Sequence, residues 1–408
     1  MSKTFFERLN LMTPSGVAYK NVNLKKQILA YFANSGNATI ADLCKTLTLS
    51  APKVTNLINE LIEEGLVNDY GKDSSTGGRR PNIYGLAPNA GFFLGVDVKR
   101  YHLNISLIDF RKNVIEIKEN YPYQLENTQE SLDELLGIIT SFINGLKIPK
   151  SKILGMGINL SGRVNHTTGY SYSFFHFQED PLSKIIESAI GIPVTLENDS
   201  RAMAFGEYSK GVVRDEKNVI FLNLDYGIGI GIIINGQIYY GKSGYSGEFG
   251  HIPIFDNEII CHCGKKGCLE TEASGWALLN TFKEHVRAGS STSAMLNKKS
   301  VDELKLKDII EAANSDDVLA IDLIAQIGNK LGRGIALLIN LFNPELVILG
   351  GSLAATEDYI RLPMKSAIHK YSLSLMSNDT QLKITALPNR AGVMGACLLV
   401  RNRLLDLA

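Results

Sequence analysis

Three of the five cysteines lie within eight residues of one another, at Cys261, Cys263 and Cys268. His251 stands ten residues before the first of them. Three thiolates and one imidazole form a complete tetrahedral ligand set for Zn²⁺, with metal–sulfur bonds of about 2.3 Å and a metal–nitrogen bond of about 2.0 Å. Cysteines grouped in this way are typical of metal or redox sites. We therefore predict a structural zinc site, with ordinary buried thiols and a core histidine as the alternative.

The spacing within the cluster favours closure around one ion. Cys261 and Cys263 are separated by one residue, so both sulfurs fall on one tight turn, and the glycines at 264 and 267 allow the chain to fold back to Cys268. His262 is a competing imidazole, although its place between two ligand cysteines would strain the ring geometry.

Two carboxylates flank the cluster. Glu248 lies three residues before His251, and Glu270 lies two residues after Cys268. A metal that fixes this loop would hold both carboxylates and the imidazole in one place. Groups held in this way can accept and donate hydrogen bonds to the vicinal hydroxyls of a sugar. We therefore expect a structural metal with a sugar bound beside it.

Residues 247–270 resemble the signature of the ROK family, which groups transcriptional repressors, including those of the N-acetylglucosamine and xylose type, with sugar kinases. The matching residues are Gly247-Glu248-x-Gly250-His251 and Cys261-x-Cys263-Gly264-x-x-Gly267-Cys268-Leu269-Glu270. The resemblance implies that structural zinc is bound by His251, Cys261, Cys263 and Cys268. It also implies that Glu248, His251 and Glu270 contact the sugar.

The length of 408 residues exceeds one ordinary core, so two or three domains are expected. Apolar residues make up 45% and charged residues 21% of the chain, which fits a soluble globular protein. The longest apolar stretch, residues 335–349, is interrupted by Asn340, Asn343, Pro344 and Glu345, so no membrane span is expected. The first residues lack the apolar core of a signal peptide. We expect a cytoplasmic protein with reduced cysteines.

The N-terminal part of the chain predicts three short helices. Apolar spacing predicts a helix over residues 24–33, Thr39 and Asp42 form a capping box, and Ser50 followed by Pro52 opens a third helix that ends at Gly65. A glycine-rich loop follows. This layout is typical of a winged helix-turn-helix, whose third helix enters the major groove of DNA. A helical protein-interaction module is the alternative.

Polar residues at the start of the third helix have the chemistry of DNA contacts, namely Ser50, Lys53, Thr55 and Asn56. Residues 1–88 carry ten Lys and Arg against seven Asp and Glu, although the whole chain has no net charge. The loop ends in Arg79 and Arg80, which suit a narrow A·T-rich minor groove. ROK repressors carry Thr-Gly-Gly-Arg-Arg-Pro here, matched by residues 76–81. A loop that only forms salt bridges with the next domain is the alternative.

From residue 89 the chain has the pattern of an α/β domain. Strand pairs at 93–98 with 104–109 and at 219–224 with 229–234 predict two similar lobes. The family resemblance implies the duplicated actin-like, ribonuclease-H-like (ASKHA) fold. We expect an N-terminal extension over 1–23, a winged helix-turn-helix over 24–88, and a two-lobed sugar-binding and dimerisation domain over 89–408.

Three further residues are implied as sugar contacts by the resemblance. Asn198 and Asp199 follow an expected strand, and in ROK kinases the aspartate is the base that accepts the proton of the sugar hydroxyl. Gly162 lies on the loop that closes over the sugar, and the neighbouring Arg163 suggests an anionic ligand such as a sugar phosphate. Capping of the following helix by Asp199 or Ser200 is the alternative.

The loops that would bind ATP phosphates depart from the kinase pattern. Asp-x-Gly-x-Thr/Ser is replaced by a segment with Lys99 and Tyr101, and Gly-Thr-Gly-x-Gly is replaced by a segment with Asp225 and Tyr226. Bulky side chains obstruct the close approach of backbone that cradles a phosphate, and a carboxylate repels one. We therefore expect a regulator and no enzymatic activity.

The sequence thus predicts a sugar-responsive transcriptional repressor. It would bind double-stranded operator DNA as a homodimer, with a tetramer as the alternative, and a sugar or sugar phosphate would be its effector. His251 would contact both zinc and effector, so that occupancy shifts the metal loop. An ATP-dependent sugar kinase and a DNA-independent sugar-binding protein are the alternative functions.

Overall fold

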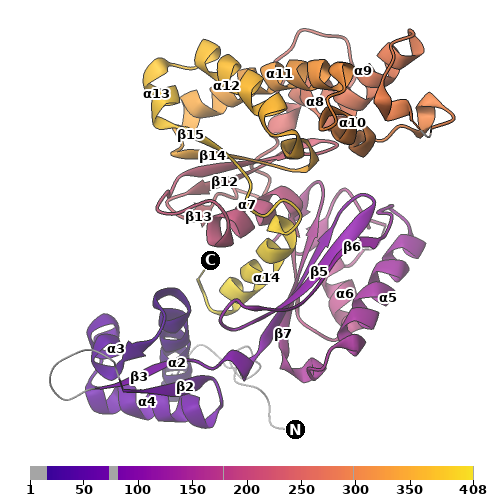
Figure 1. Ribbon diagram of the computed structural model, residues 1–408. Coiled ribbons are helices and arrows are strands. Elements are labelled where there is room, and N and C mark those ends of the chain that lie inside the picture. Colours follow the sequence, from indigo (N-terminus) through magenta and orange to yellow (C-terminus); the bar gives the residue numbers. More distant parts are fainter. Residues whose placement is uncertain (1–15, 73–80, 178, 297, 408) are drawn as a thin grey trace. The chain divides into compact units, whose positions relative to one another are not determined.

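The computed structural model describes residues 16–72, 81–177, 179–296 and 298–407 (Figure 1). These residues form two compact units, one running to Glu197 and resuming at Ala396, and the other comprising Asn198–Gly395. Among the described residues, no helix combines the length and the apolar character that a membrane-spanning segment needs.

The N-terminal elements form a winged helix-turn-helix, as predicted. They are α2 (Gly16–Ser35), β1 (Ala38–Thr39), α3 (Ile40–Leu47), α4 (Ala51–Glu63), β2 (Val67–Lys72) and β3 (Asn82–Leu86), and the sheet has the order β1-β3-β2. One face of α4 is buried through Val54, Leu57, Ile58 and Leu61. The capping box at α3 is present: Thr39 Oγ1 accepts a hydrogen bond from the N–H of Asp42, whose carboxylate accepts one from the N–H of Thr39 at 3.0 Å. That backbone bond lowers the pKa of Asp42.

The predicted start of the first helix is wrong. Helix α2 begins at Gly16, so the expected boundary at residue 23 lies inside a helix. Its early part contains a polar contact that hydrophobic spacing does not indicate, because Lys53 Nζ donates to Asn21 Oδ1 at 2.6 Å. Farther along α2, within the predicted range, the buried Lys25 pairs with Glu60 at 2.7 Å and Glu64 at 3.0 Å.

The first lobe contains a five-stranded sheet with the order β10-β7-β4-β5-β6. Strands β4 (Phe92–Val98), β5 (His102–Asp109) and β6 (Val114–Pro122) form an antiparallel meander, and β7 (Ile153–Leu160) runs parallel to β4. The other elements in this part of the chain are η1 (Pro88–Ala90), α5 (Gln129–Gly145), η2 (Lys150–Lys152), β8 (Val164–Asn165), β9 (Tyr170–Ser171), α6 (Leu182–Ile190) and β10 (Val194–Asn198).

The second lobe repeats this topology, with the strand order β13-β12-β11-β14-β15. Strands β11 (Val219–Leu224), β12 (Ile228–Ile234) and β13 (Gln237–Ile238) form the antiparallel meander, and β14 (Leu346–Gly350) and β15 (Gln381–Ile384) add in parallel. In both sheets the first strand of the meander lies at the centre and pairs with the fourth strand. The shared order confirms the predicted duplicated, two-lobed α/β fold.

Helices and short 3-10 turns complete the second half of the chain. They are α7 (Asp199–Lys210), η3 (Phe249–His251), α8 (Leu269–Ala273), α9 (Gly275–Arg287), η4 (Ser293–Met295), η5 (Val301–Glu303), α10 (Leu306–Ala313), α11 (Val318–Phe342), η6 (Ser352–Thr356), α12 (Asp358–Tyr371), α13 (Ser374–Asp379) and α14 (Ala391–Leu404). Helices α11 and α12 lie side by side (Figure 1). Gly332 allows this approach, because a Cβ atom there would lie 2.5 Å from the carbonyl oxygen of Met364.

A buried carboxylate joins α7 to the segment after β15. Glu207 is fully buried, and its Oε1 accepts hydrogen bonds from the N–H of Leu387 at 2.7 Å and from the hydroxyl of Thr385. Its Oε2 accepts one from the N–H of Val212 at 3.1 Å. Two donors from a distant segment and one from the residues just after α7 therefore converge on this side chain.

Substitution of Glu207 should destabilise the second lobe. In Glu207→Gln an amide NH₂ replaces one acceptor and faces a buried donor, so we expect the free energy of unfolding to fall by about 2 kcal/mol. Glu134→Gln, on the exposed side of α5, is the matched control and should change it by less than about 0.5 kcal/mol. Urea denaturation followed by circular dichroism measures both; equal effects would contradict the role of Glu207.

Candidate metal and ligand site

A single segment supplies the predicted metal ligands. This segment, residues 248–270, is called the metal loop; it begins in η3, which contains His251, and ends in the first turn of α8. Isolated bridges between Pro253 and Cys268 and between Ile260 and Lys266 fold it back on itself. The fold-back brings residues far apart in the loop to one point, as the glycine spacing predicted.

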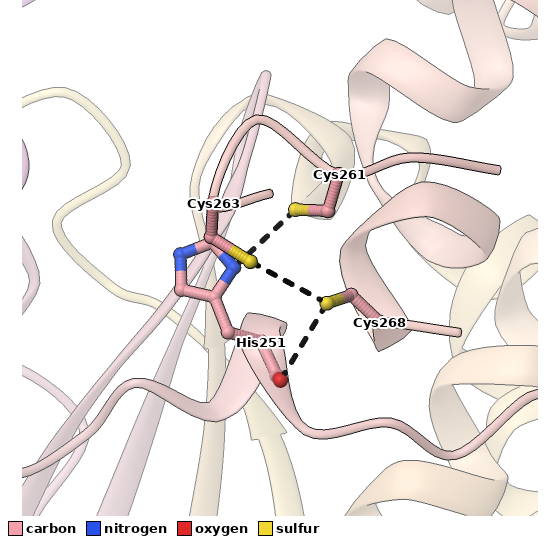
Figure 2. Close-up of side chains that lie close together, drawn as sticks. All are labelled: His251, Cys261, Cys263 and Cys268. Atoms are coloured by element: carbon pink, nitrogen blue, oxygen red, sulfur yellow. Dashed lines mark hydrogen bonds between the residues drawn. The ribbon is translucent and has the colours of Figure 1, made fainter. Parts of the chain in front are cut away.

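The three sulfurs and the imidazole of His251 face one another (Figure 2). One ligand atom from each of His251, Cys261, Cys263 and Cys268 lies within 4.8 Å of all the others. The His251 Nδ1 to Cys261 Sγ distance is 3.5 Å, and the Cys263 and Cys268 sulfurs are 3.7 Å apart. A tetrahedral centre with metal–sulfur bonds of about 2.3 Å places its sulfurs about 3.8 Å apart. The four side chains can therefore hold a metal ion.

Burial raises the pKa of two of these thiols. The pKa of Cys261 is raised, and that of Cys268 is raised to about 12 by burial together with the neighbouring thiols. The cysteines form no disulfide. Crowded, buried thiols of this kind are unfavourable as free thiolates, and a cation is the natural partner for their charge.

The metal loop packs on a helix of the second lobe. Leu269 and Phe249, which adjoin ligands at either end of the loop, are buried. Both lie against Gly334 in α11, where a Cβ atom would be 2.9 Å from Leu269 Cδ2 and 3.0 Å from Phe249 Cζ. A side chain at Gly334 would therefore displace the loop, and its absence lets α11 support both ends of the loop.

The second nitrogen of His251 faces a carboxylate. Its Nε2 lies 3.7 Å from Glu248 Oε2, while Nδ1 faces Cys261. A carboxylate beside the nitrogen that does not bind metal orients the imidazole and increases its basicity as a ligand. Glu248 is itself exposed, so its oxygens also face solvent.

His262, the competing imidazole, has a different environment. Its side chain is 74% exposed, and its Nδ1 lies 3.1 Å from Glu270 Oε1 and 3.8 Å from Cys261 Sγ. It groups with His251 and Glu270 and lies outside the set formed by the three cysteines. The geometry thus favours His251 as the fourth ligand.

Glu270 is held at the edge of this group by backbone. Its side chain is largely buried, and Oε2 accepts a hydrogen bond from the N–H of Ile228 at 2.9 Å. Gly227 leaves room for it, since a Cβ atom there would lie 2.7 Å from the same oxygen. Together with the contacts of His251, this brings Glu248, His251 and Glu270 to one place, as predicted.

Asn198 and Asp199 lie beside the hairpin formed by β11 and β12, which also contains Ile228. Asn198 caps α7, because its Oδ1 accepts from the N–H of Arg201 at 3.1 Å; the alternative cap at Asp199 or Ser200 is therefore wrong. Asp199 Oδ1 accepts from the amide of Asn198 at 3.0 Å and from the N–H of Ser200 at 2.8 Å.

The hairpin of β11 and β12 contacts both halves of the site. Asn223 in β11 is 3.5 Å from Asp199 Oδ2, while Ile228 in β12 holds Glu270. Sequence reasoning missed Asn223, whose only signal is one polar residue near the end of an apolar strand. The hairpin links the predicted sugar contacts of α7 to those of the metal loop.

Gly162 lies in the first lobe, after β7. Its φ is +86°, and a Cβ atom there would lie 2.2 Å from Ser173 Oγ. That hydroxyl accepts a hydrogen bond from the N–H of Arg163 at 3.0 Å. Both the backbone conformation and the close contact require glycine, and a role in ligand contact stays a prediction.

The predicted DNA contacts differ in exposure. Ser50 and Asn56 are exposed, and the Ser50 hydroxyl makes no cap bond. Lys53 and Thr55 are half-buried and hydrogen-bonded within the module: Lys53 Nζ donates to Asn21 Oδ1, and Thr55 Oγ1 donates to the carbonyl of Ala51 at 2.8 Å, so their role in DNA contact stays a prediction. Arg79 and Arg80 lie outside the described residues.

The two loops that depart from the kinase pattern are closed by contacts within each lobe. In the first lobe Lys99 Nζ lies 3.4 Å from the buried carboxylate of Asp97. In the second lobe Asp225 Oδ1 accepts a hydrogen bond from Ser352 Oγ at 3.0 Å. The first N–H groups of α9, those of Gly275 and Trp276, donate at 2.9 Å to the carbonyls of Asp225 and Tyr226. The Asp225 carboxylate and the first two N–H groups of α9 are therefore already hydrogen-bonded within the lobe.

Comparison with known proteins covers nearly the whole chain. Residues 93–403 match the model of the ROK family, and residues 23–68 match a winged helix-turn-helix DNA-binding model. The chain is 30% identical over 404 residues to the N-acetylglucosamine repressor of Escherichia coli O157:H7, covering 97% of this chain and 98% of that protein. Both parts of the predicted organisation are therefore found in one relative.

Similar solved structures include a transcriptional regulator and a kinase. A ROK family transcriptional regulator, a homologue of the E. coli Mlc protein, matches with a TM-score of 0.79 and 27% identity over 95% of this chain and 97% of that chain. A ROK family glucokinase from Streptomyces griseus, solved with glucose and AMPPNP, matches with a TM-score of 0.67 and 28% identity over 76% of this chain and 99% of that chain. The regulator covers more of this chain than the kinase does.

The ligand assignment can be tested by metal analysis. We expect Cys263→Ser to lose the metal that the purified wild-type protein retains, because three ligands hold a divalent ion far less tightly than four. His262→Ala should retain it, since His262 lies outside the sulfur cluster. Elemental analysis after gel filtration measures both, with Cys397→Ser as the control cysteine. Loss of metal in His262→Ala with retention in Cys263→Ser would overturn the assignment.

Proposed function

Because this chain belongs to the ROK family and carries an N-terminal winged helix-turn-helix, we propose that it is a sugar-responsive transcriptional repressor. The observation that carries the proposal is the presence, in one chain, of a DNA-binding module and of a metal loop with clustered carboxylates and imidazole. A relative named as a repressor aligns over nearly the full length of both proteins. The winged helix-turn-helix would bind operator DNA, and the part of the chain that contains the metal loop would bind the effector.

Zinc is the metal proposed for the loop. Three thiolates and one imidazole are a donor set that suits Zn²⁺, and they leave no open position for a reacting molecule. The metal would thus supply no chemistry when bound. The role of the chain's own residues His251, Cys261, Cys263 and Cys268 would be to fix the loop, so that Glu248 and Glu270 are held in place without an effector.

A sugar or sugar phosphate is the proposed effector. Its hydroxyls would contact the groups held at the hairpin and metal loop, namely Asn198, Asp199, Glu248, His251 and Glu270, with Gly162 from the first lobe. Carboxylates accept hydrogen bonds, and the amide and imidazole can donate as well as accept, so the set matches the mixed character of hydroxyl groups. The backbone and side-chain bonds to Asp199 and Glu270 support the proposal, because pre-ordered contacts reduce the cost of binding.

Double-stranded operator DNA is the proposed partner in the cytoplasm. Helix α4 would enter the major groove and use Ser50, Lys53, Thr55 and Asn56, with Arg79 and Arg80 in the minor groove. A homodimer would read two half-sites, with a tetramer as the alternative. Large exposed apolar side chains at the ends of α11 and α12 support self-association: Leu337, Leu341, Phe342, Tyr371 and Leu373.

A sugar kinase is the runner-up, because the S. griseus glucokinase shares the two-lobed fold. The contacts of Asp225 weigh against it. A phosphate at this loop would have to displace Ser352 from the carboxylate and would then meet a negative charge. The chain's residues therefore suit sugar binding without phosphoryl transfer.

The proposal is tested by binding of the full chain to fluorescent DNA from upstream of its own gene. We expect specific binding that one member of a sugar panel relieves; the panel contains D-glucose, D-xylose, N-acetyl-D-glucosamine and their phosphates. With ATP and the same sugars, no ADP should be released. Rapid, sugar-dependent ADP release would establish the kinase in its place.

Variants locate the DNA contact. Asn56→Ala should weaken operator binding about tenfold, since it removes an exposed amide at the start of α4. Asn144→Ala, which removes an exposed amide at the end of α5, is the matched control and should bind as the wild type does. Equal binding by both variants would argue against α4 as the helix that contacts the operator. If the wild type shows no specific DNA binding, the alternative function of a DNA-independent sugar-binding protein would remain.

A further inference from the structure

The segment that precedes Glu248 is a loop rich in glycine. Between β13 and η3, residues 239–248 form a loop, called here the Glu248 loop. Gly241, Gly244 and Gly247 have φ values of +67°, +80° and +98°, a conformation that glycine adopts at little cost. Tyr239 and Tyr245 are 47% and 38% exposed. In the described stretch 241–247, Gly244 is the only buried residue.

The ends of this loop are held by local contacts. The N–H of Tyr239 donates to the carbonyl of Ile232 at 2.8 Å, and the N–H of Ser246 donates to the carbonyl of Tyr240 at 3.3 Å. Close to Glu248, a Cβ atom on Gly247 would lie 2.7 Å from the carbonyl oxygen of Ile230. The hydroxyl of Ser246 also donates to the carbonyl of Tyr239. These contacts fix where the loop leaves and rejoins the sheet.

Arg201 supplies a contact to the middle of the loop. Arg201 lies on α7 and is only 4% exposed. Its Nη1 donates a hydrogen bond to the carbonyl of Gly244 at 2.9 Å. The guanidinium also lies over the ring of Tyr240, 5.6 Å from its centroid. A hydrogen bond from a charged donor to a carbonyl is among the stronger ones in proteins, and burial strengthens it further.

The same residue adjoins the other half of the site. Arg201 is two positions after Asp199, and its N–H donates to Asn198 Oδ1 at 3.1 Å. One residue, Arg201, therefore connects the segment with Asn198 and Asp199, through its N–H, to the loop that ends in Glu248, through its side chain. Without it, glycines on either side of Gly244 would allow the loop to sample other paths.

We propose that Arg201 is a positioning residue for the effector site: it fixes the Glu248 loop relative to Asn198 and Asp199 without touching the effector. This inference rests on the proposed function, because it takes the carboxylate of Glu248 as a contact of the bound sugar. A loop that is already ordered binds the effector more tightly than one that must become ordered on binding, because less conformational entropy is lost when the effector binds.

A purely structural role for Arg201 makes a different prediction. Arg401 offers the comparison: it is 1% exposed, and its Nε donates to the carbonyl of Phe110 at 3.0 Å, in the first lobe. It has the same chemistry as Arg201, a buried guanidinium on a backbone carbonyl, but none of the predicted effector contacts adjoins it in the sequence. Arg401→Met should therefore lower thermal stability without a local effect on the Glu248 loop.

The experiment compares the full chain with Arg201→Met, Arg201→Lys and Arg401→Met. Hydrogen exchange resolved by mass spectrometry should show amides of residues 241–247 exchanging at least tenfold faster in Arg201→Met than in the wild type. Arg201→Lys retains a charged donor and should give an intermediate rate. Metal content and operator affinity should stay within twofold of the wild type, and Arg401→Met should leave the exchange of 241–247 unchanged.

Calorimetry with the panel sugars, N-acetyl-D-glucosamine first, should show affinity weakened about tenfold in Arg201→Met and partly restored in Arg201→Lys. Unchanged exchange of 241–247 in Arg201→Met, or acceleration equal throughout the second lobe, would overturn the inference. The exchange measurement needs no ligand. If no sugar binds the wild type, the proposed function fails, but hydrogen exchange still decides whether Arg201 orders the Glu248 loop.

Discussion

The convergence of three sulfurs and one imidazole within a single loop is the constraint on which the rest of the site depends. The metal loop has no long helix or strand of its own, and its fold-back is defined by two isolated bridges and by packing on α11 at Gly334. A metal ion held by these four side chains would make this irregular segment rigid. Because Glu248 and Glu270 are the two ends of the metal loop, their separation and direction would follow from the same four ligands.

Polar contacts distinguish the part of the second lobe that would bind a sugar from the part that would bind a nucleotide. Asp199 and Glu270 are held by donors that leave carboxylate oxygens beside the hairpin. Asp225, in contrast, is bonded to Ser352, and the nearby backbone donors of α9 are already used. These contacts support the proposal that the chain binds a sugar without phosphoryl transfer, as a sensor joined to a DNA-binding module would.

Much of this could be predicted from the sequence where the signal is local. The spacing of Cys261, Cys263 and Cys268, the capping box at Thr39 and the repeated hairpins all depend on neighbours a few residues away. Contacts between distant segments could not be predicted. The first part of α2 contains Asn21, whose partner Lys53 lies in α4, and the supports of the site depend on Asn223 and Arg201, whose partners lie 24 and 43 residues away along the chain.

The central claim, that a bound metal orders the effector site, is tested most directly by removing the metal from the intact protein with a chelator. Operator binding should then be measured with and without the sugar that releases the native protein from the operator. We expect that the metal-free protein still binds the operator but is no longer released by the sugar, and that added Zn²⁺ restores release. Undiminished release of the metal-free protein at the same sugar concentration would contradict it.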